Sequence, residues 1–342
     1  MITTIEWTGG AVRLLDQTKL PRTVEYLNIT TPNRMAQAIA DMEVRGAPLI
    51  GVAAAYGMAL SGLNRKGDLT EIEKDGEHLR SARPTATNLA WAVDEQLKAA
   101  RQAAKNGANA VMDALIENAI RIHKEDAEIN RKIGEHLLTL LKPGMGVLTH
   151  CNAGVLATTA YGTATAPFYL AQERGIPLRI YADETRPRLQ GASLTAFELH
   201  EAGMDVTLIC DNMAAVLMRQ GKIDAIITGC DRVAKNGDTA NKIGTFNVSI
   251  LAKHFGIPLY IAAPGPTIDF SCPTGAEIPI EERNGDETRS ISGVQVAPKD
   301  VKVFNPSFDV TPASHIAAIV TERGIARPPY EQSLAALYQE NP

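Results

Sequence analysis

The sequence AIITGCDRVAKNGDTANKIGT, residues 225–245, indicates how the second half of this chain is built. It begins with an apolar run at 225–227, continues through a segment rich in glycine and polar residues, and becomes apolar again from Ile243. That order is typical of a strand, a loop and a helix. In an open parallel sheet, ligands bind beyond the carboxyl ends of the strands, so we expect Asp231 to be a strand-end carboxylate facing a cleft. The spacing leaves open that Asp231 caps the next helix or pairs with Arg232.

Segments of this kind recur through the second half of the chain. Apolar runs that suit buried strands occur at 146–148, 178–181, 206–209, 225–227 and 259–262, with helical segments between them. Strands that alternate with helices predict βαβ units, and therefore an α/β fold with a parallel sheet covered on both faces. The dinucleotide fingerprint GxGxxG followed by an acidic residue is absent, so this sheet is not an evident nicotinamide site.

The first part of the chain has a different pattern. Residues 1–30 alternate apolar and polar side chains around Gly9-Gly10, which predicts a short antiparallel sheet with a Gly-Gly turn. Thr31 and Pro32 predict the start of a helix, with threonine as N-cap and proline at the first helical position. Short strands and helices are therefore expected before the parallel sheet begins.

The chain is long enough for two domains, because 342 residues exceed the ~250–300 at which single cores stop growing. A long helical pattern at 109–141 is interrupted by a polar run at 123–130. We place the boundary near that interruption. The expected domains are a smaller N-terminal α+β domain, 1–126, and a catalytic α/β domain, 127–342.

Composition narrows the class of protein. The formal net charge of -5, without a block of lysine and arginine, argues against nucleic acid as the main partner. The four cysteines are far apart and form no CxxC pair, so neither a zinc site nor a disulfide framework is indicated. The N-terminus lacks a signal-peptide pattern, and we expect no apolar run of the ~18 residues that span a membrane. These features favour the cytoplasm.

Polar residues follow the expected strands, and in a parallel sheet they would gather at one edge. These residues are Cys151, Glu184, Gln190, Asp211 and Asp231. A thiol, carboxylates and amides in one crevice indicate an active site. Cys151 precedes an expected helix start whose amides would favour the thiolate, although a free cysteine can also be a small buried hydrophobe. Its neighbour His150 is expected to point to the other face of the strand and to be structural.

A possible phosphate site precedes the sheet. Arg45, with the amides of Gly46 and Ala47, lies at the expected start of a helix, where a guanidinium and the positive helix end suit an anion. An ordinary turn with a solvated arginine is the alternative. Arg83 is a second possible anion contact or a surface arginine. Gln190 lies near another helix start, where a neutral amide suits sugar hydroxyls.

Six motifs taken together resemble the methylthioribose-1-phosphate isomerase family. They are RGAP at 45–48, RPT at 83–85, THCNAG at 149–154, DETRPRLQGA at 183–192, GCDRVAKNGDTANKIGT at 229–245 and NPSFDVTP at 305–312. The resemblance implies a small N-terminal domain of strands and helices followed by a Rossmann-like domain, usually in a homodimer. It also implies conversion of 5-methylthioribose 1-phosphate to 5-methylthioribulose 1-phosphate in methionine salvage, with no metal or organic cofactor.

The resemblance also assigns residues. It implies Asp231 as the acid and Cys151 as its catalytic partner, with a substrate-binding set of Arg45, Gly46, Ala47, Arg83, Gln190, Asn241 and Lys242. Cys230 and Val233 depart from the residues more common in the family, and neither is expected to change the function. We expect Asp231 to be protonated in a poorly hydrated cleft and to open the ring. Cys151 would then move the C2 proton as a thiolate, or only shape an apolar pocket for a hydride shift.

Related activities stay open at this point. Ribose-1,5-bisphosphate isomerase and 5-deoxyribose-1-phosphate isomerase share the cysteine and aspartate positions and differ in the pocket for the C5 substituent. Regulatory subunits of the translational guanine-exchange factor two-B share the fold but are binding proteins. The presence of both Cys151 and Asp231 favours an enzyme.

Overall fold

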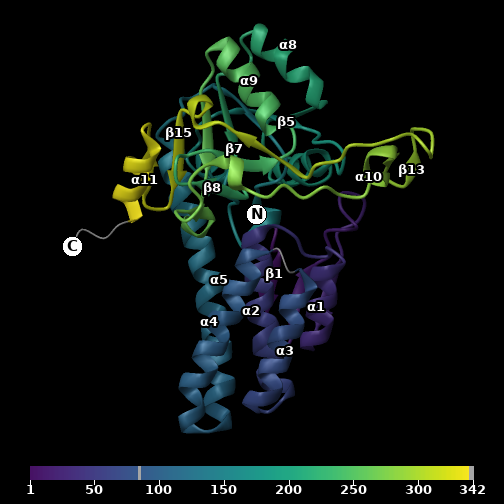
Figure 1. The fold of residues 1–342 in the computed structure, drawn as a ribbon, viewed down its shortest axis with the longest axis vertical. Coiled ribbons are helices and arrows are strands. Elements are labelled where there is room, and N and C mark those ends of the chain that lie inside the picture. The colour runs from purple at the N-terminus through teal and green to yellow at the C-terminus, as the bar shows by residue number, and fades with distance from the viewer. Residues whose placement is uncertain (84–85, 339–342) are drawn as a thin grey trace. The chain divides into compact units, whose positions relative to one another are not determined.

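The computed structural model describes residues 1–83 and 86–338, which divide into two compact units (Figure 1). The N-terminal unit consists of Met1–Asn130 and Val155–Gly162, and the C-terminal unit of Arg131–Gly154 and Thr163–Pro342. The predicted RPT motif lies outside the described residues except for its arginine. The domains 1–126 and 127–342 expected from the sequence stay a prediction.

The N-terminal unit begins with the predicted antiparallel sheet. Its strands β1 (Ile5–Trp7), β2 (Val12–Leu15) and β3 (Tyr26–Ile29) pair in the order β1-β2-β3. Helices follow it: α1 (Pro32–Ala40), α2 (Ala47–Asn64), α3 (Leu69–Ala82), α4 (Thr87–Ala103) and α5 (Ala108–Leu138). The predicted cap of α1 is confirmed, because the Thr31 side chain accepts a hydrogen bond from the Arg34 amide at 3.2 Å.

Helix α2 is the core of the N-terminal unit. It is buried from Leu49 to Gly62, and its small residues allow α1 and α4 to pack closely against it. Among the described residues, α2 is the one helix that is long and apolar enough to cross a membrane by length and composition alone. Its burial within the unit identifies it as a core helix, for which length and composition give the same signal.

Helix α5 is continuous, so the interruption predicted at 123–130 is wrong. The polar residues there make contacts that the helical pattern alone does not reveal. The Asp126 carboxylate accepts hydrogen bonds from the amide and the hydroxyl of Thr159, at 2.7 and 2.6 Å. These bonds tie residues 155–162 to α5, which explains why this loop belongs to the N-terminal unit.

The C-terminal unit contains a seven-stranded sheet in the order β16-β15-β10-β7-β4-β5-β6. Its strands are β4 (Gly146–Thr149), β5 (Arg179–Asp183), β6 (Val206–Ile209), β7 (Ala225–Thr228), β10 (Leu259–Ala262), β15 (Ala318–Thr321) and β16 (Gly324–Ala326). All pairs are parallel except β15 with β16. The predicted Rossmann-like α/β fold and all five predicted strands are confirmed.

Helices connect these strands. They are α6 (Ala166–Glu173), α7 (Ala196–Glu201), α8 (Ala214–Arg219) and α9 (Thr245–Phe255), and α11 (Tyr330–Tyr338) follows the last strand. A short helix α10 (Asp286–Arg289) and the hairpin of β12 (Ser290–Ile291) with β13 (Val294–Gln295) project from the sheet (Figure 1).

The segment between β7 and α9 differs from the prediction. It was expected to be a loop, but it forms a hairpin of β8 (Arg232–Ala234) and β9 (Thr239–Lys242). With β11 (Ile268–Asp269) and β14 (Phe308–Thr311), this hairpin makes a second sheet in the order β11-β8-β9-β14. The partners that complete this sheet lie far along the chain, so local sequence did not reveal it.

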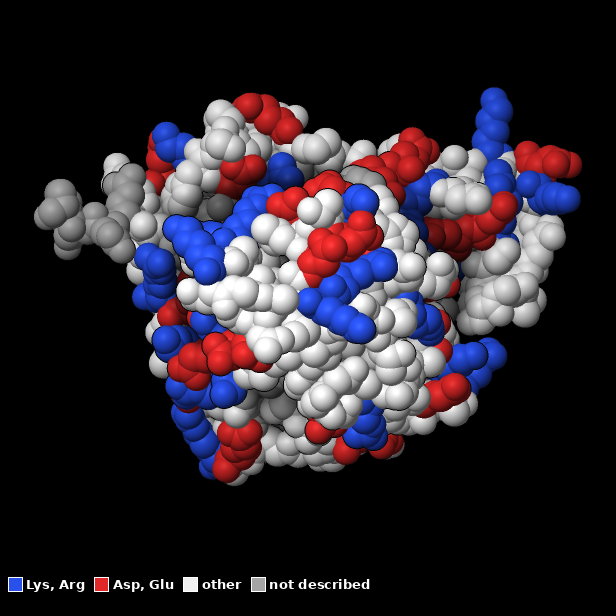
Figure 2. Space-filling model, turned by 90° about the horizontal axis from the view of Figure 1, so that it is seen from below, with Lys and Arg blue, Asp and Glu red and all other residues white. Residues whose placement is uncertain are grey.

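Figure 2 shows lysine and arginine side chains interspersed with aspartate and glutamate over one face of the molecule. This mixture agrees with the modest net charge of -5.

Candidate active site

The strand order of the large sheet defines where a site can form. Counted along the chain from β4 to β15, the parallel strands lie in the order 3-2-1-4-5-6, which reverses between β4 and β7. Ligands of doubly wound sheets bind at such a reversal, beyond the carboxyl ends of the strands. Cys151 follows the end of β4 and Asp231 follows the end of β7. The two residues expected to be catalytic therefore leave neighbouring strands at this point.

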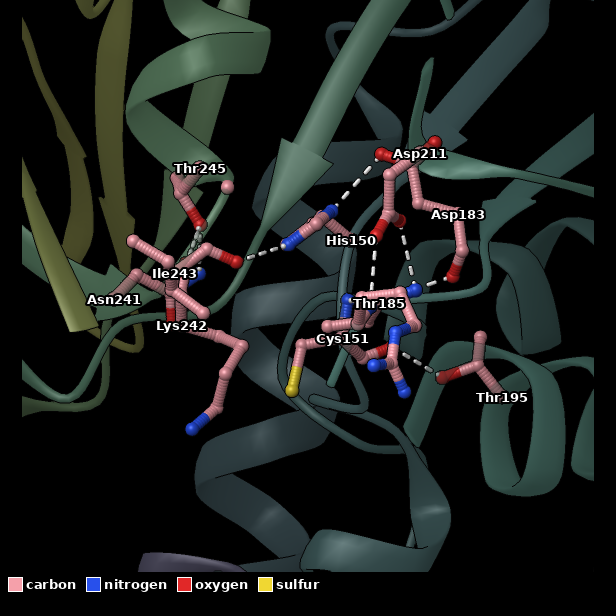
Figure 3. Close-up of polar contacts among 12 residues, drawn as sticks. His150, Cys151, Asp183, Thr185, Thr195, Asp211, Asn241, Lys242, Ile243 and Thr245 are labelled. Atoms are coloured by element: carbon pink, nitrogen blue, oxygen red, sulfur yellow. Dashed lines mark hydrogen bonds and ion pairs between the residues drawn. The ribbon is translucent and has the colours of Figure 1, made fainter. Parts of the chain in front are cut away.

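Cys151 has a left-handed backbone conformation, with φ of +65°. A non-glycine residue in this region costs about 1–3 kcal/mol and persists only when its surroundings hold it. The Cys151 amide donates to Thr185 Oγ1 at 2.8 Å, and its carbonyl accepts from Thr195 Oγ1 at 2.6 Å (Figure 3). The thiol-bearing residue is partly buried.

The helix start expected beside Cys151 is not present. Residues 151–165 are all described, and they contain only a short 3-10 helix, Val155–Ala157, before α6 begins at Ala166. The Asn-Ala-Gly sequence that suggested a cap instead makes a turn, in which Asn152 contacts buried Glu198.

Behind Cys151 lies a buried histidine and aspartate pair. His150 Nδ1 lies 2.9 Å from Asp183 Oδ2, and Nε2 lies 2.9 Å from the carbonyl oxygen of Ile243. Because a carbonyl only accepts, Nε2 carries a proton, and a second proton is shared between Nδ1 and the carboxylate. Burial would lower the pKa of His150, but the hydrogen bond and charge of Asp183 outweigh it, so the pKa is raised. The expected structural role of His150 agrees with this geometry.

Among the described residues, His150, Asp183 and Asp211 form the one group of side chains close enough together to be a candidate metal site. The ligand atoms of the three side chains lie within 4.8 Å of one another. Both ring nitrogens of His150 are hydrogen bonded, however, and the Asp211 carboxylate accepts from the amides of Thr185 and Arg186 at 2.8 and 2.7 Å. These bonds suit a structural network better than a metal site.

Asn241 and Lys242 lie on strand β9. Asn241 is buried and donates from Nδ2 to Thr245 Oγ1 at 2.9 Å. Lys242 Nζ donates to the carbonyl of Ser307 at 3.0 Å and lies 4.5 Å from the centre of the Phe308 ring. These contacts fix the position of the ammonium group that the resemblance assigns to substrate.

A small pocket of about 200 Å³ brings two of the expected binding residues together. It is lined by Pro187, Arg188, Gln190, Lys242, Ile243, Arg283, Glu287, Asn305, Pro306 and Ser307. Gln190 stands just before the π-helical turn Gly191–Thr195 that leads into α7, which agrees with its expected place near a helix start. Within the described chain, its Oε1 and the buried Ser307 Oγ have no hydrogen-bond partner. The pocket therefore offers polar atoms to a ligand.

Asp231 differs from its expected environment. It was expected in a poorly hydrated cleft, but it is exposed, on the turn between β7 and β8. Its amide donates to the Ala240 carbonyl at 2.9 Å, which fixes the backbone at this position. The preceding Cys230 packs between the Ala262 carbonyl and Thr267, and burial raises the pKa of its thiol to about 12.

The remaining binding residues belong to the N-terminal unit. Arg45, Gly46 and Ala47 form the turn into α2, as expected. Gly46 has φ of +91°, and a Cβ placed there would lie 2.5 Å from the Ala157 Cα. Only glycine fits this close approach. Arg83 stands at the C-terminal end of α3.

Sequence reasoning missed several residues that shape the site. Thr195 carries no sequence signal, because hydroxyls are common in turns, whereas Thr185 and Ser307 lie within the quoted motifs at 183–192 and 305–312. Asp309 could have been found from the NPSFDVTP motif. Its carboxylate accepts from the amides of Gly244 and Phe246, at 2.7 and 3.0 Å, and so caps α9 from a distant strand.

Comparison with known proteins agrees with the predicted resemblance. A 5-deoxyribose 1-phosphate isomerase from Bacillus thuringiensis serovar kurstaki is 55% identical over 340 residues, or 98% of each chain. The structure resembles 5-methylthioribose 1-phosphate isomerase from Pyrococcus horikoshii OT3, with a TM-score of 0.96 and 39% identity, over 100% of this chain and 97% of that one.

It also resembles subunit delta of translation initiation factor eIF-2B from A. fulgidus, with a TM-score of 0.92 and 40% identity, over 98% and 99% of the two chains. The model of the initiation factor 2 subunit family matches residues 43–328. On these matches, the chain belongs to the initiation factor 2 subunit family.

Proposed function

We propose that this protein is a sugar-phosphate isomerase that converts 5-methylthioribose 1-phosphate to 5-methylthioribulose 1-phosphate in methionine salvage. The observation that carries the proposal is the pair Cys151 and Asp231, which leaves neighbouring strands at the reversal of the sheet order. The isomerases among its relatives support the same class of reaction. We place the enzyme in the cytoplasm as a homodimer that works without a metal or organic cofactor.

The substrate dictates the first step. Its phosphate esterifies the anomeric oxygen, so the ring cannot open to a free aldehyde. We assign Asp231 as the acid that donates a proton to the ring oxygen while the bond from that oxygen to C1 breaks. Because Asp231 is exposed in this structure, its protonated form requires the bound sugar to exclude water from the carboxyl group.

The second step moves hydrogen from C2 to C1. In the proton route, the Cys151 thiolate takes the C2 proton to give an enol phosphate, and the thiol, whose proton exchanges with solvent, then protonates C1. The Asp231 carboxylate accepts the C2 hydroxyl proton as the ketone forms, which restores both groups. In the hydride route, hydrogen passes directly from C2 to C1 and Cys151 only shapes the pocket.

Solvent deuterium distinguishes these routes. Incorporation at C1 of the product supports the proton route, and full retention of the original hydrogen favours the hydride route.

We assign substrate binding to the residues that the resemblance implies. Arg45 and the amides of Gly46 and Ala47 would hold the phosphate, with Arg83 as a further cation. Gln190 and Asn241 would bind ribose hydroxyls, and Lys242 would place a positive charge beside them. The lining of the pocket that contains Gln190 and Lys242 includes charged and amide side chains, so we expect it to receive an oxygen-rich part of the substrate.

A second substrate is favoured by a specific observation. The relative that is 55% identical is named for 5-deoxyribose 1-phosphate, whose C5 is a methyl group where the first substrate has a methylthiomethyl group. Pockets discriminate such apolar groups by only about 1–3 kcal/mol, so one enzyme can accept both. A binding role without catalysis is the third possibility, because one similar structure is named as a translation factor subunit.

The test is turnover of three sugar phosphates by the purified full-length protein. We expect 5-methylthioribose 1-phosphate and 5-deoxyribose 1-phosphate to be isomerised, and ribose 1,5-bisphosphate to react at least ten times more slowly, because a second phosphate needs additional cations. The ratio of kcat/KM for the first two identifies the preferred substrate. Absence of turnover with all three, by protein that is folded by circular dichroism, would leave the binding role.

A further inference from the structure

The peptide groups of Cys151 are held by side chains and not by a strand ladder. Its amide donates to Thr185 Oγ1, whose hydroxyl donates to the Asp183 carbonyl at 3.1 Å. Its carbonyl accepts from Thr195 Oγ1, which accepts in turn from Asn152 Nδ2 at 3.0 Å. Each hydroxyl therefore donates one hydrogen bond and accepts another, a combination that only a hydroxyl group of this size provides.

Thr185 is itself fixed by the neighbouring strand. Asp211, just beyond β6, accepts the amides of Thr185 and Arg186 at 2.8 and 2.7 Å. Thr185 consequently adopts φ of +64°, another left-handed conformation that a β-branched residue rarely takes. A chain of hydrogen bonds thus runs from Asp211 beyond β6, through Thr185 beyond β5, to Cys151 beyond β4.

The arrangement explains how Cys151 keeps φ at +65°. A residue with this backbone relaxes unless its amide and carbonyl are both satisfied in that conformation. Thr185 and Thr195 are both buried, so their hydroxyls do not readily exchange these bonds for water. Cys151, which bears the thiol that the proposed reaction uses, is thus held in the left-handed region together with its partner Thr185.

We propose that Thr185 and Thr195 are positioning residues that hold the backbone of Cys151 in its left-handed conformation, with Asp211 setting the position of Thr185. This inference rests on the proposed function for its catalytic consequence. The two hydroxyls act through Cys151 and do not contact the substrate. They fix the direction in which the thiol leaves the backbone, and thereby its distance from the reacting carbon.

Matched variants separate the hydroxyl from the volume of the side chain. Thr185→Val keeps the shape and removes both hydrogen bonds, whereas Thr185→Ser keeps the hydroxyl and loses a methyl group. We expect kcat of Thr185→Val to fall at least about tenfold with KM within about twofold, because misplacement of a reacting group by about 1 Å can cost 10²-fold. Thr185→Ser should stay within about threefold of the wild type, as a substitution that keeps the hydroxyl.

Amide hydrogen exchange provides a readout that does not depend on catalysis. Loss of the acceptor should speed exchange of the Cys151 amide in Thr185→Val but not in Thr185→Ser, measured by mass spectrometry on peptides that cover residues 149–154. If the wild-type protein is not an isomerase, amide exchange still decides whether Thr185 positions the Cys151 backbone. The proposed function would then fail in the turnover assay, independently of the positioning role.

Wild-type exchange of the Cys151 amide in Thr185→Val would overturn the proposal, and so would equal losses of kcat in the valine and serine variants. Should Thr185→Val not fold, Thr195→Val and Thr195→Ser provide the same comparison from the carbonyl side of Cys151. We expect Thr195→Val to have a lower kcat with an unchanged KM, and Thr195→Ser to recover the kcat of the wild type. Equal activity of the two Thr195 variants would contradict the role.

Discussion

The turn that precedes α2 gives a prediction whose size can be worked out from the structure. Gly46 has φ of +91°, and a Cβ there would lie 2.5 Å from the Ala157 Cα and 2.6 Å from its carbonyl oxygen. Gly46→Ala therefore carries two costs. The left-handed conformation costs alanine about 1–2 kcal/mol. The contact with backbone atoms adds about 1–3 kcal/mol, as overpacking does in protein cores.

Gly107→Ala is the matched control. Gly107 lies in the same unit with a similar φ of +95°, with ψ of 174° against 128° at Gly46, but a Cβ there meets nothing within 4 Å. The cost of a positive φ and the lower entropy of unfolded alanine apply to both variants and are therefore largely removed from their difference. Gly46→Ala should therefore be about 1–3 kcal/mol less stable than Gly107→Ala.

Tryptophan fluorescence is the suitable assay. The chain has two tryptophans, Trp7 and Trp91, and both belong to the N-terminal unit. Urea denaturation followed by fluorescence thus reports the unit that contains both glycines. Equal free energies of unfolding for the two variants would refute the reasoning, because the close approach of residues 155–162 to the start of α2 would then have no energetic effect.

Three further predictions concern buried polar groups. Burial raises the pKa of Tyr56 to about 12. The stability that comes from keeping this hydroxyl neutral is complete below the unfolded pKa of about 10 and is lost as pH rises towards 12. Between pH 9 and 12, the stability advantage of the wild type over Tyr56→Phe should therefore shrink by about 2 kcal/mol, measured by urea titration. Asp309→Asn places an NH2 donor opposite the Gly244 or Phe246 amide, which is also a donor. The variant should lower the stability of the C-terminal unit by about 1–2 kcal/mol, measured by calorimetry. An unchanged unfolding transition would refute the role of Asp309 as a cap. Asp126→Asn weakens the two bonds from Thr159 and should speed amide exchange in residues 155–162, whereas unchanged exchange would show that other contacts hold this loop.

Much of the fold follows from local pattern. The strands of the parallel sheet are short apolar runs bounded by turns, and the cap at Thr31 needs only its own neighbours, so periodicity and capping predicted both. The hairpin of β8 and β9 could not be found in this way. Its residues are polar, and its partner β14 lies more than sixty residues further along the chain.

The candidate site follows the same division. Strand order places Cys151 and Asp231 beyond adjacent strands, as expected from an alternating α/β sequence. The sequence did not predict the environments of Cys151 and Asp231, because these environments depend on residues that are distant along the chain. The backbone of Cys151 is held by Thr185 and Thr195, and the exposure of Asp231 results from a hairpin that the sequence did not predict.

The most direct test of the account is turnover of 5-methylthioribose 1-phosphate by the wild-type protein beside Asp231→Asn, with equal folding verified by circular dichroism. Asparagine has nearly the same shape but no acidic proton, and loss of a general acid typically costs 10²–10⁴-fold in rate, so we predict at least about a hundredfold lower kcat. Wild-type turnover that Asp231→Asn retains in full would contradict the role of Asp231 as the acid that opens the ring.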